Sequence, residues 1–362
     1  QPAAHDRGQE VAVARAAWPG RLATGQPASS LLLLQTRPGS PAVPMVPAMP
    51  LPPAWTNVDT SGVTAADLDL RVHADDWLPT TLFTPPQSFP RPRPALILCH
   101  ATGGARGSLA ASARAAAAHG YIVATPDARW HGGWLADGGA DRGGARRVYG
   151  DALVAGLAGD KGHPFLLDSV WDGARIIDWL TSLPDVDPTR IGATGVSLGG
   201  MQAWLLAAAD PRLSAAAPLI GVQSFSYAAE NDAWRARAGS IGEPFAAAAK
   251  KEGKAEPDAA TFRGVLDALA PGLRTVYDAP ASIAAIAPRP FLAVNGDADA
   301  RCPAAGVRAA FDAAAPAYAA ANASDALRVV LEPGVGHEVT AGMAGEAFSW
   351  FDRWLGGGRG QG

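Results

Sequence analysis

Short apolar runs, each separated from the next by a segment with helical spacing, most strongly limit what this chain can fold into. Their sequences are ALILC, YIVAT, RIGATGV, AAAPLIG, PFLAVNG and LRVVLEP, at residues 95–99, 121–125, 190–196, 215–221, 290–296 and 327–333. Strands of this length that are apolar throughout are typical of parallel sheets, in which both faces are covered. The alternation predicts the α/β class, with a mostly parallel central sheet and helices on both faces.

The segments around these runs agree with that architecture. In the segment 168–183, Val170, Ala174, Ile177 and Leu180 follow one another at helical spacing and form one apolar face. Ahead of the first run, residues 67–74 and 78–84 alternate apolar and polar side chains, which predicts a half-buried antiparallel hairpin.

The pattern also suggests how the chain is divided. Residues 1–60 are rich in proline and show no sustained period, so we predict a flexible N-terminal segment. Residues 61–357 form the predicted α/β domain, and residues 358–362 a flexible tail. Residues 222–285 contain no core strand, so we expect a helical insertion over the carboxyl edge of the sheet, where such segments form lids or pocket walls.

Charge and hydropathy exclude several kinds of partner. The 362 residues carry a net charge of −4, which is too weak to favour nucleic acid or an anionic membrane. No apolar run approaches the roughly 18–20 residues that span a bilayer. Cys99 and Cys302 cannot form a disulfide framework, and we expect reduced thiols in an intracellular, cytoplasmic protein. The chain begins with Gln, so a removed targeting peptide and a plastid location stay open.

A serine between two glycines marks the strongest chemical motif. It reads Gly195-Val196-Ser197-Leu198-Gly199, and Ser197 lies where the run 190–196 meets a predicted helix. This strand–serine–helix context is the one in which Gly-x-Ser-x-Gly forms a tight turn that exposes the hydroxyl. Ser197 is therefore the predicted nucleophile, although a small helix N-cap is the simpler interpretation of the same residue.

A serine nucleophile needs a base and an acid that orients the base. His337 is the only histidine after Ser197, and it follows the run 327–333. Asp299 follows the run 290–296, with Asp297 two residues earlier as the competing acid. Carboxyl ends of parallel strands meet at one edge of the sheet, so Ser197, Asp299 and His337 are predicted to meet there in the order Ser, Asp, His.

Further residues near that edge are candidates for binding. The backbone N–H groups of Leu198 and Thr102 are the predicted oxyanion donors, since Thr102 lies in a Gly-rich loop after the first run. His131, Trp130 and Trp234 are candidates for the substrate pocket, with a structural hydrogen bond or packing under loops as the alternative for each. No histidine or carboxylate spacing indicates a metal site, and we expect no cofactor.

These motifs resemble those of the α/β-hydrolase superfamily, of the dienelactone hydrolase and prolyl-oligopeptidase catalytic-domain type. Over about residues 66–355, the segments DARWHGG, RIGATGVSLGGMQAW, PLIGVQSF, ENDAW, IAPRPFLAVNGDADARCP and EPGVGH are most similar to a plant and green-algal branch. The resemblance implies the α/β-hydrolase fold and assigns Ser197, Asp299 and His337 as nucleophile, acid and base. One departure is the loop His100-Ala101-Thr102-Gly103, where the family usually has His-Gly-x-Gly, so the oxyanion donor in this loop stays open.

The predicted function is hydrolysis of small carboxylic esters by a serine hydrolase. Peptide hydrolysis is the second candidate, ranked lower because no large N-terminal propeller precedes the domain. A ligand receptor or interaction protein on the same fold is an alternative of another class. Dinucleotide-dependent redox chemistry is disfavoured, because the glycines do not follow the Gly-x-Gly-x-x-Gly spacing. The sequence does not fix the oligomeric state.

Overall fold

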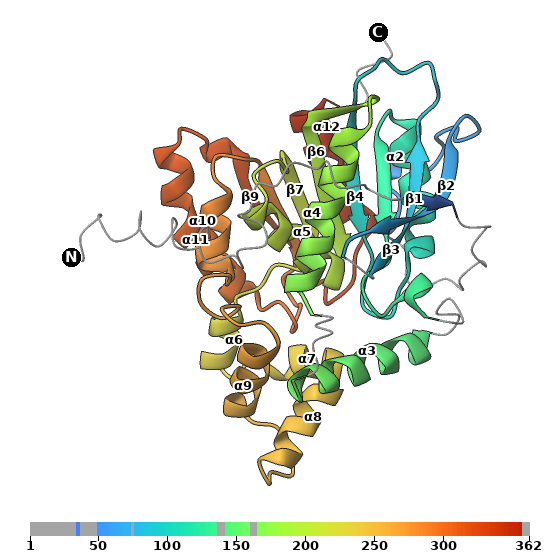
Figure 1. Ribbon diagram of the computed structural model, residues 1–362. Coiled ribbons are helices and arrows are strands. Elements are labelled where there is room, and N and C mark those ends of the chain that lie inside the picture. The colour runs from blue at the N-terminus through green and yellow to red at the C-terminus, as the bar shows by residue number, and fades with distance from the viewer. Residues whose placement is uncertain (1–33, 37–48, 74–75, 136–141, 160–164, 357–362) are drawn as a thin grey trace.

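The computed structural model describes residues 34–36, 49–73, 76–135, 142–159 and 165–356, and these form a three-layer α/β architecture (Figure 1). The strands are β1 (Leu34–Thr36), β2 (Thr64–Arg71), β3 (Trp77–Thr84), β4 (Arg93–Cys99), β5 (Ile122–Pro126), β6 (Val186–Val196), β7 (Ala215–Leu219), β8 (Phe291–Gly296) and β9 (Leu327–Glu332). They make one sheet in the order β1-β2-β3-β5-β4-β6-β7-β8-β9. The strands β4 to β9 are parallel. The strands β2 and β3 form the predicted antiparallel hairpin, which joins the sheet through β5, and β1 adds a further antiparallel edge strand.

Helices cover both faces of the sheet. One layer holds α2 (Ala110–Ala118) and α12 (Ala341–Leu355), and the other holds α4 (Leu167–Ser182), α5 (Leu198–Ala209), α10 (Ala279–Ile286) and α11 (Ala304–Ala320). Short 3-10 helices are η1 (Pro53–Trp55), η2 (Arg106–Leu109), η3 (Gly132–Trp134), η4 (Gly239–Ile241) and η5 (Ser324–Ala326). No helix in the described parts of the chain is both long and apolar enough to cross a membrane.

The central strand β4 shows why the runs are apolar without interruption. Its side chains alternate between the two faces of the sheet. Ala95 and Ile97 belong to the core under α4 and α5, whereas Leu96 and Leu98 belong to the core under α2 and α12. All four are completely buried, because helices exclude water from both faces. A parallel strand in this position therefore needs apolar residues at every position.

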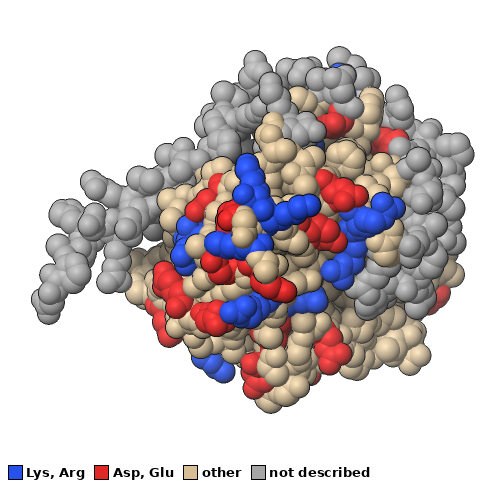
Figure 2. Space-filling view, turned by 90° about the horizontal axis from the view of Figure 1, so that it is seen from below, with Lys and Arg blue, Asp and Glu red and all other residues tan. Residues whose placement is uncertain are grey.

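A group of helices lies beyond the carboxyl edge of the sheet, below it in Figure 1. The segment between β7 and β8 supplies α6 (Phe225–Glu230), α7 (Arg235–Ala238), α8 (Gly242–Lys251) and α9 (Ala259–Leu269). The helix α3 (Arg142–Leu157) packs against α8 and α9, so it joins the same group. The face of the molecule seen from below carries Lys and Arg interspersed with Asp and Glu, without dominance of either sign (Figure 2).

The described structure begins nearer the N-terminus than the predicted domain boundary at residue 61. Within the segment predicted to be flexible, Leu34–Thr36 pairs with β2 as an edge strand. Met49 and Trp55 are buried, and the Trp55 ring stacks on His119 and contacts Phe348. These residues add an apolar contact to the α2 and α12 layer. Residues 1–33, 37–48 and 357–362, which cover most of the predicted segment and the predicted tail, lie outside the described residues.

Candidate active site

Ser197 occupies a strained turn between β6 and α5. Its backbone has φ +55° and ψ −104°, a conformation that is uncommon for a residue with a side chain. The flanking glycines make the turn sterically feasible: a Cβ on Gly199 would lie 2.1 Å from the Cys99 carbonyl oxygen, and one on Gly195 would lie 2.5 Å from the same atom. The turn therefore packs directly against the end of β4 and raises the Ser197 hydroxyl to the edge of the sheet.

His337 reaches Ser197 from the loop after β9. Its Nε2 lies 2.8 Å from the Ser197 Oγ. The loop approaches the end of β8 so closely that a Cβ on Gly296 would lie 2.0 Å from the Val335 carbonyl oxygen. A side chain at position 296 would displace this loop, and the His337 ring with it. The glycine at the end of β8 thus allows the base to reach the nucleophile.

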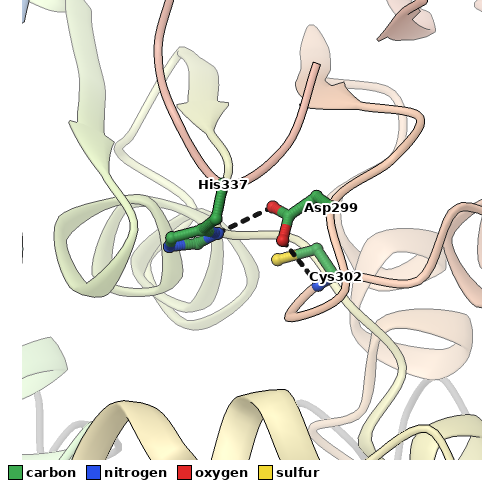
Figure 3. Close-up of side chains that lie close together, drawn as sticks. All are labelled: Asp299, Cys302 and His337. Atoms are coloured by element: carbon green, nitrogen blue, oxygen red, sulfur yellow. Dashed lines mark hydrogen bonds and ion pairs between the residues drawn. The ribbon is translucent and has the colours of Figure 1, made fainter. Parts of the chain in front are cut away.

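Asp299 lies on the other side of the His337 ring, with its Oδ2 2.7 Å from His337 Nδ1 (Figure 3). Its Oδ1 accepts hydrogen bonds from the backbone N–H groups of Arg301, at 2.8 Å, and Cys302, at 3.3 Å. A carboxylate only accepts, so His337 Nδ1 carries the proton and Nε2 keeps its lone pair for the serine. Asp297 is exposed and accepts the Gly334 N–H, so Asp299 is the aspartate next to His337.

The environment keeps the histidine neutral and the aspartate ionised. Burial lowers the pKa of His337, and the charges of Arg237 and Arg301 act in the same direction against the raising effect of Asp299. Burial alone raises the pKa of Asp299, but the hydrogen bond and charge of His337, with the Arg301 N–H, bring it below its usual value. At neutral pH the pair is therefore an unprotonated imidazole beside a carboxylate, as a general base requires.

A cavity of about 240 Å³ opens beside Ser197 and His337. Its other polar lining comes from Thr102, Arg146, Ser240, Arg301 and Glu338. A second, much smaller chamber shares Thr102 and Ser240 with it and is mainly apolar, with Leu198, Phe245 and Leu266 among its walls. Ser240 of the insertion and Arg146 of α3 therefore line the cavity, and the helices α8 and α9 of the insertion supply walls of the smaller chamber.

The two predicted oxyanion donors lie beside these spaces. Leu198 is the first residue of α5, where the backbone N–H has no partner within the helix. Thr102 lines both the cavity and the smaller chamber from the loop after β4. A carbonyl oxygen held between the two N–H groups is consistent with these positions, and the assignment stays a proposal.

His131 does not line the cavity among the described residues. It is completely buried, with Nδ1 2.9 Å from the Arg129 carbonyl oxygen and its ring 5.2 Å from His100 and 4.7 Å from Tyr149. Burial and the neighbouring His100 lower the pKa of His131 to about 3, so it stays neutral. His131 therefore has the alternative role considered in the sequence analysis, a structural hydrogen bond, and is not part of the described cavity lining.

The two tryptophans also lie away from the described cavity lining. Trp234 is 2% exposed, packs against Phe262 and donates its Nε1–H to Asp232 at 3.0 Å. Trp130 is 38% exposed, on a turn where its own φ is +62°. Trp234 thus stabilises the helical insertion from within, and Trp130 is directed to the surface. Aromatic residue type alone does not distinguish these positions from a pocket wall.

Sequence reasoning missed the cationic residues of the site. Arg301 could have been noticed, because it follows Asp299 by two residues in the same loop. Arg146 gave no signal, because nothing in the pattern of α3 distinguishes it from Arg147. Arg237 on α7 is 5% exposed and donates to Gln223 Oε1 at 3.0 Å and to Cys302 Sγ at 3.3 Å. It therefore connects the helical insertion to the loop that carries Asp299.

One set of potential metal ligands coincides with this site. Ligand atoms of Asp299, Cys302 and His337 lie within 4.8 Å of one another (Figure 3). However, Asp299 and His337 bond to each other, and burial raises the pKa of the Cys302 thiol to about 12. A metal ion here would have to displace both the proton between the first two residues and the Arg237 contact. We therefore assign Asp299 and His337 to the hydrogen-bonded chain of Ser197 and not to a metal site.

A mostly parallel sheet, helices on both faces and a serine turn after the middle strand define the α/β-hydrolase fold. Residues 70–280 match the model of the X-Pro dipeptidyl-peptidase (S15) family. The chain belongs to this family, and the matched range includes Ser197. This confirms the fold class and superfamily predicted from the sequence.

Individual proteins are similar to this chain in sequence or in structure. The hydrolase YtaP of Bacillus subtilis (strain 168) is 28% identical over 186 residues, which cover 51% of this chain and 53% of YtaP. The match thus spans about half the length of that relative. The structure is similar to acetyl xylan esterase 1 from Thermoanaerobacterium sp. JW/SL YS485, with TM-score 0.59, 16% identity and coverage of 98% of this chain and 95% of that chain. It is also similar to the glucuronoyl esterase from Solibacter usitatus, with TM-score 0.57, 14% identity and coverage of 97% and 92%.

Proposed function

We propose that this protein is a serine hydrolase that cleaves small carboxylic esters, with Ser197 as nucleophile, His337 as general base and Asp299 as the acid that orients the base. The observation that carries the proposal is the continuous hydrogen-bonded chain from Ser197 Oγ through both nitrogens of His337 to Asp299, with links of 2.8 and 2.7 Å. Both links have the length at which a proton can be transferred between the two heavy atoms.

The first half of the reaction forms an acyl-enzyme. Ser197 Oγ attacks the ester carbonyl carbon while its proton moves to His337 Nε2. The tetrahedral intermediate collapses, the bond from carbon to the alcohol oxygen breaks, and His337 gives its proton to that oxygen. The acyl group stays on Ser197, and the alcohol leaves through the cavity.

Water completes the cycle. His337 removes a proton from the water as the water oxygen attacks the acyl carbon, and the proton then returns to Ser197 Oγ as the carboxylic acid leaves. In both halves the negative charge on the substrate oxygen lies between the N–H groups of Leu198 and Thr102. Loss of one such donor in comparable sites costs about 10²–10³-fold in kcat.

Peptide hydrolysis is the second candidate, because the matching family model describes an X-Pro dipeptidyl-peptidase. An enzyme that removes dipeptides must hold the substrate's terminal ammonium near the nucleophile, and a buried carboxylate suits that group. The cavity beside Ser197 has Arg146 and Arg301 in its wall instead, and its one lining acid among the described residues, Glu338, is exposed. These charges favour esters over peptides with a free amino terminus.

The proposal is tested by steady-state turnover of p-nitrophenyl acetate and p-nitrophenyl butyrate, with Ala-Pro p-nitroanilide as the peptide substrate. The account predicts that the esters are hydrolysed and that Ser197→Ala lowers kcat by about 10⁴-fold or more. Ser214→Ala, which changes a serine outside the site, is the control and keeps wild-type activity. Ser197→Ala activity near that of the wild type, or turnover of the peptide alone, contradicts the proposal.

A further inference from the structure

Two arginines from distant parts of the chain line the cavity next to the candidate nucleophile. Arg146 comes from α3, and Arg301 comes from the loop after β8. Both are half-buried, so their guanidinium groups are partly removed from water where a substrate would lie. Glu338 also lines the cavity, but it is exposed, so water screens its charge.

These arginines have no carboxylate partner within 4 Å among the described residues. Arg146 donates to the Ser240 carbonyl oxygen at 2.7 Å. Arg147, the next residue on α3, instead forms an ion pair with Asp151 on the outer side of the helix. Arg237, which lines the smaller chamber, adds a third, buried guanidinium. Burial lowers the pKa of Arg301, and the charges of Arg237 and Arg146 lower it further, as expected of cations that lie close together.

The charge of the Asp299 carboxylate favours the charged form of Arg301, but among the described contacts it accepts no hydrogen bond from either guanidinium. Its two oxygens already accept hydrogen bonds from His337 and from the backbone N–H groups of Arg301 and Cys302. Partly buried like charges cost free energy unless an ion of opposite charge accompanies them. A guanidinium is a planar, always charged donor that matches a carboxylate, so arginines are favoured where carboxylates are bound.

We propose that the substrate is an ester that also carries a carboxylate, which Arg146 and Arg301 bind while the ester carbonyl lies at Ser197. The inference rests on the proposed esterase function and names the substrate class for that site. A volume of about 240 Å³ lies below the roughly 300–1,000 Å³ of most small-molecule pockets, so the substrate is small, such as the monoester of a short dicarboxylic acid.

The test compares esters of similar size with and without this charge, each rate taken relative to the rate of the same ester with hydroxide so that leaving-group differences cancel. Mono-p-nitrophenyl adipate is paired with p-nitrophenyl hexanoate, and 4-acetoxybenzoate with 4-methylphenyl acetate. The first pair places the carboxylate on the acyl side of the ester, and the second places it on the alcohol side. The wild type is expected to prefer the anionic member of at least one pair by about tenfold or more in kcat/KM, since a hydrogen bond between a guanidinium and a carboxylate is stronger than one between neutral groups.

Variants then assign the preference to the arginines. Arg146→Gln is expected to remove at least tenfold of the preference, lowering kcat/KM for the anionic ester more than for the neutral ester, and Arg146→Lys is expected to recover part of the loss. Arg147→Gln removes the same charge from the outer side of α3 and is expected to leave the preference unchanged. Arg301→Gln tests the second arginine. Turnover of the neutral ester by this variant shows whether the neighbouring Asp299 still orients His337.

The outcomes separate this inference from the proposed function. Hydrolysis of neutral esters by the wild type without preference for either anionic ester overturns the inference and leaves the esterase intact. Equal losses for neutral and anionic esters in Arg146→Gln also overturn it, because the arginine would then position the site and not bind the substrate. Absence of Ser197-dependent turnover of all four esters refutes the proposed function itself.

Discussion

Replacement of Asp299 by asparagine isolates the role of one proton in the site. The carboxylate Oδ1 accepts two backbone N–H groups, those of Arg301 and Cys302, so the amide oxygen of asparagine must stay on that side. The amide NH₂ then faces His337 Nδ1, at the place where the 2.7 Å contact now lies. A donor there forces Nδ1 to become an acceptor, and the ring proton moves to Nε2. His337 then has no lone pair to accept the proton of Ser197.

The expected loss follows from that tautomer. In a Ser-His-Asp site the same exchange costs about 10⁴-fold in kcat, or about 5 kcal/mol at 1.36 kcal/mol for each factor of ten. The assay is p-nitrophenyl butyrate hydrolysis at pH 7, with the thermal unfolding midpoint measured alongside to show that the nearly isosteric variant folds. Asp297→Asn is the matched control, because its exposed side chain can still accept the Gly334 N–H, and it should change kcat less than twofold. A loss under tenfold in Asp299→Asn refutes the assignment of the acid.

Two further predictions concern titration and thiol reactivity. Because burial and the charges of Arg237 and Arg301 lower the pKa of His337, and the base is active only when neutral, kcat/KM should fall on the acid side with an apparent pKa below about 6.5. Arg237→Gln removes one of those charges, so the pKa of His337 should rise and the acidic limb of the pH profile should move to higher pH. A shift of that limb to lower pH contradicts the argument. Burial raises the pKa of both Cys99 and Cys302 to about 12, so a disulfide reagent at pH 8 should label neither thiol in the native protein and both in guanidinium chloride. Rapid labelling of either native thiol contradicts their burial.

Much of the fold could be predicted, because its signals are local. Every predicted core strand corresponds to an observed one within a few residues, since a strand covered on both faces must be apolar throughout. The helix face of Val170, Ala174, Ile177 and Leu180 is buried as its spacing predicts. The edge strand Leu34–Thr36 was missed, because three residues carry too little periodicity to detect.

The candidate site could be predicted only in part. Loops after three parallel strands converge at one sheet edge, so the positions of Ser197, Asp299 and His337 follow from the strand order. Strand order alone could not separate Asp299 from Asp297, because the choice depends on which carboxylate the loop turns toward the histidine, and only the resemblance to the family favoured Asp299. The pocket walls depend on how α3 and the insertion pack, and that packing buries Trp234 while it brings Arg146 to the cavity.

The most direct measurement of the central claim is covalent labelling with a fluorophosphonate, followed by intact mass and peptide mapping. The account predicts one adduct per chain, on Ser197, because the neutral imidazole of His337 activates that hydroxyl. His337→Ala should abolish the adduct without unfolding the protein. A folded wild-type protein that gains no adduct, or gains it on another serine, would contradict the account.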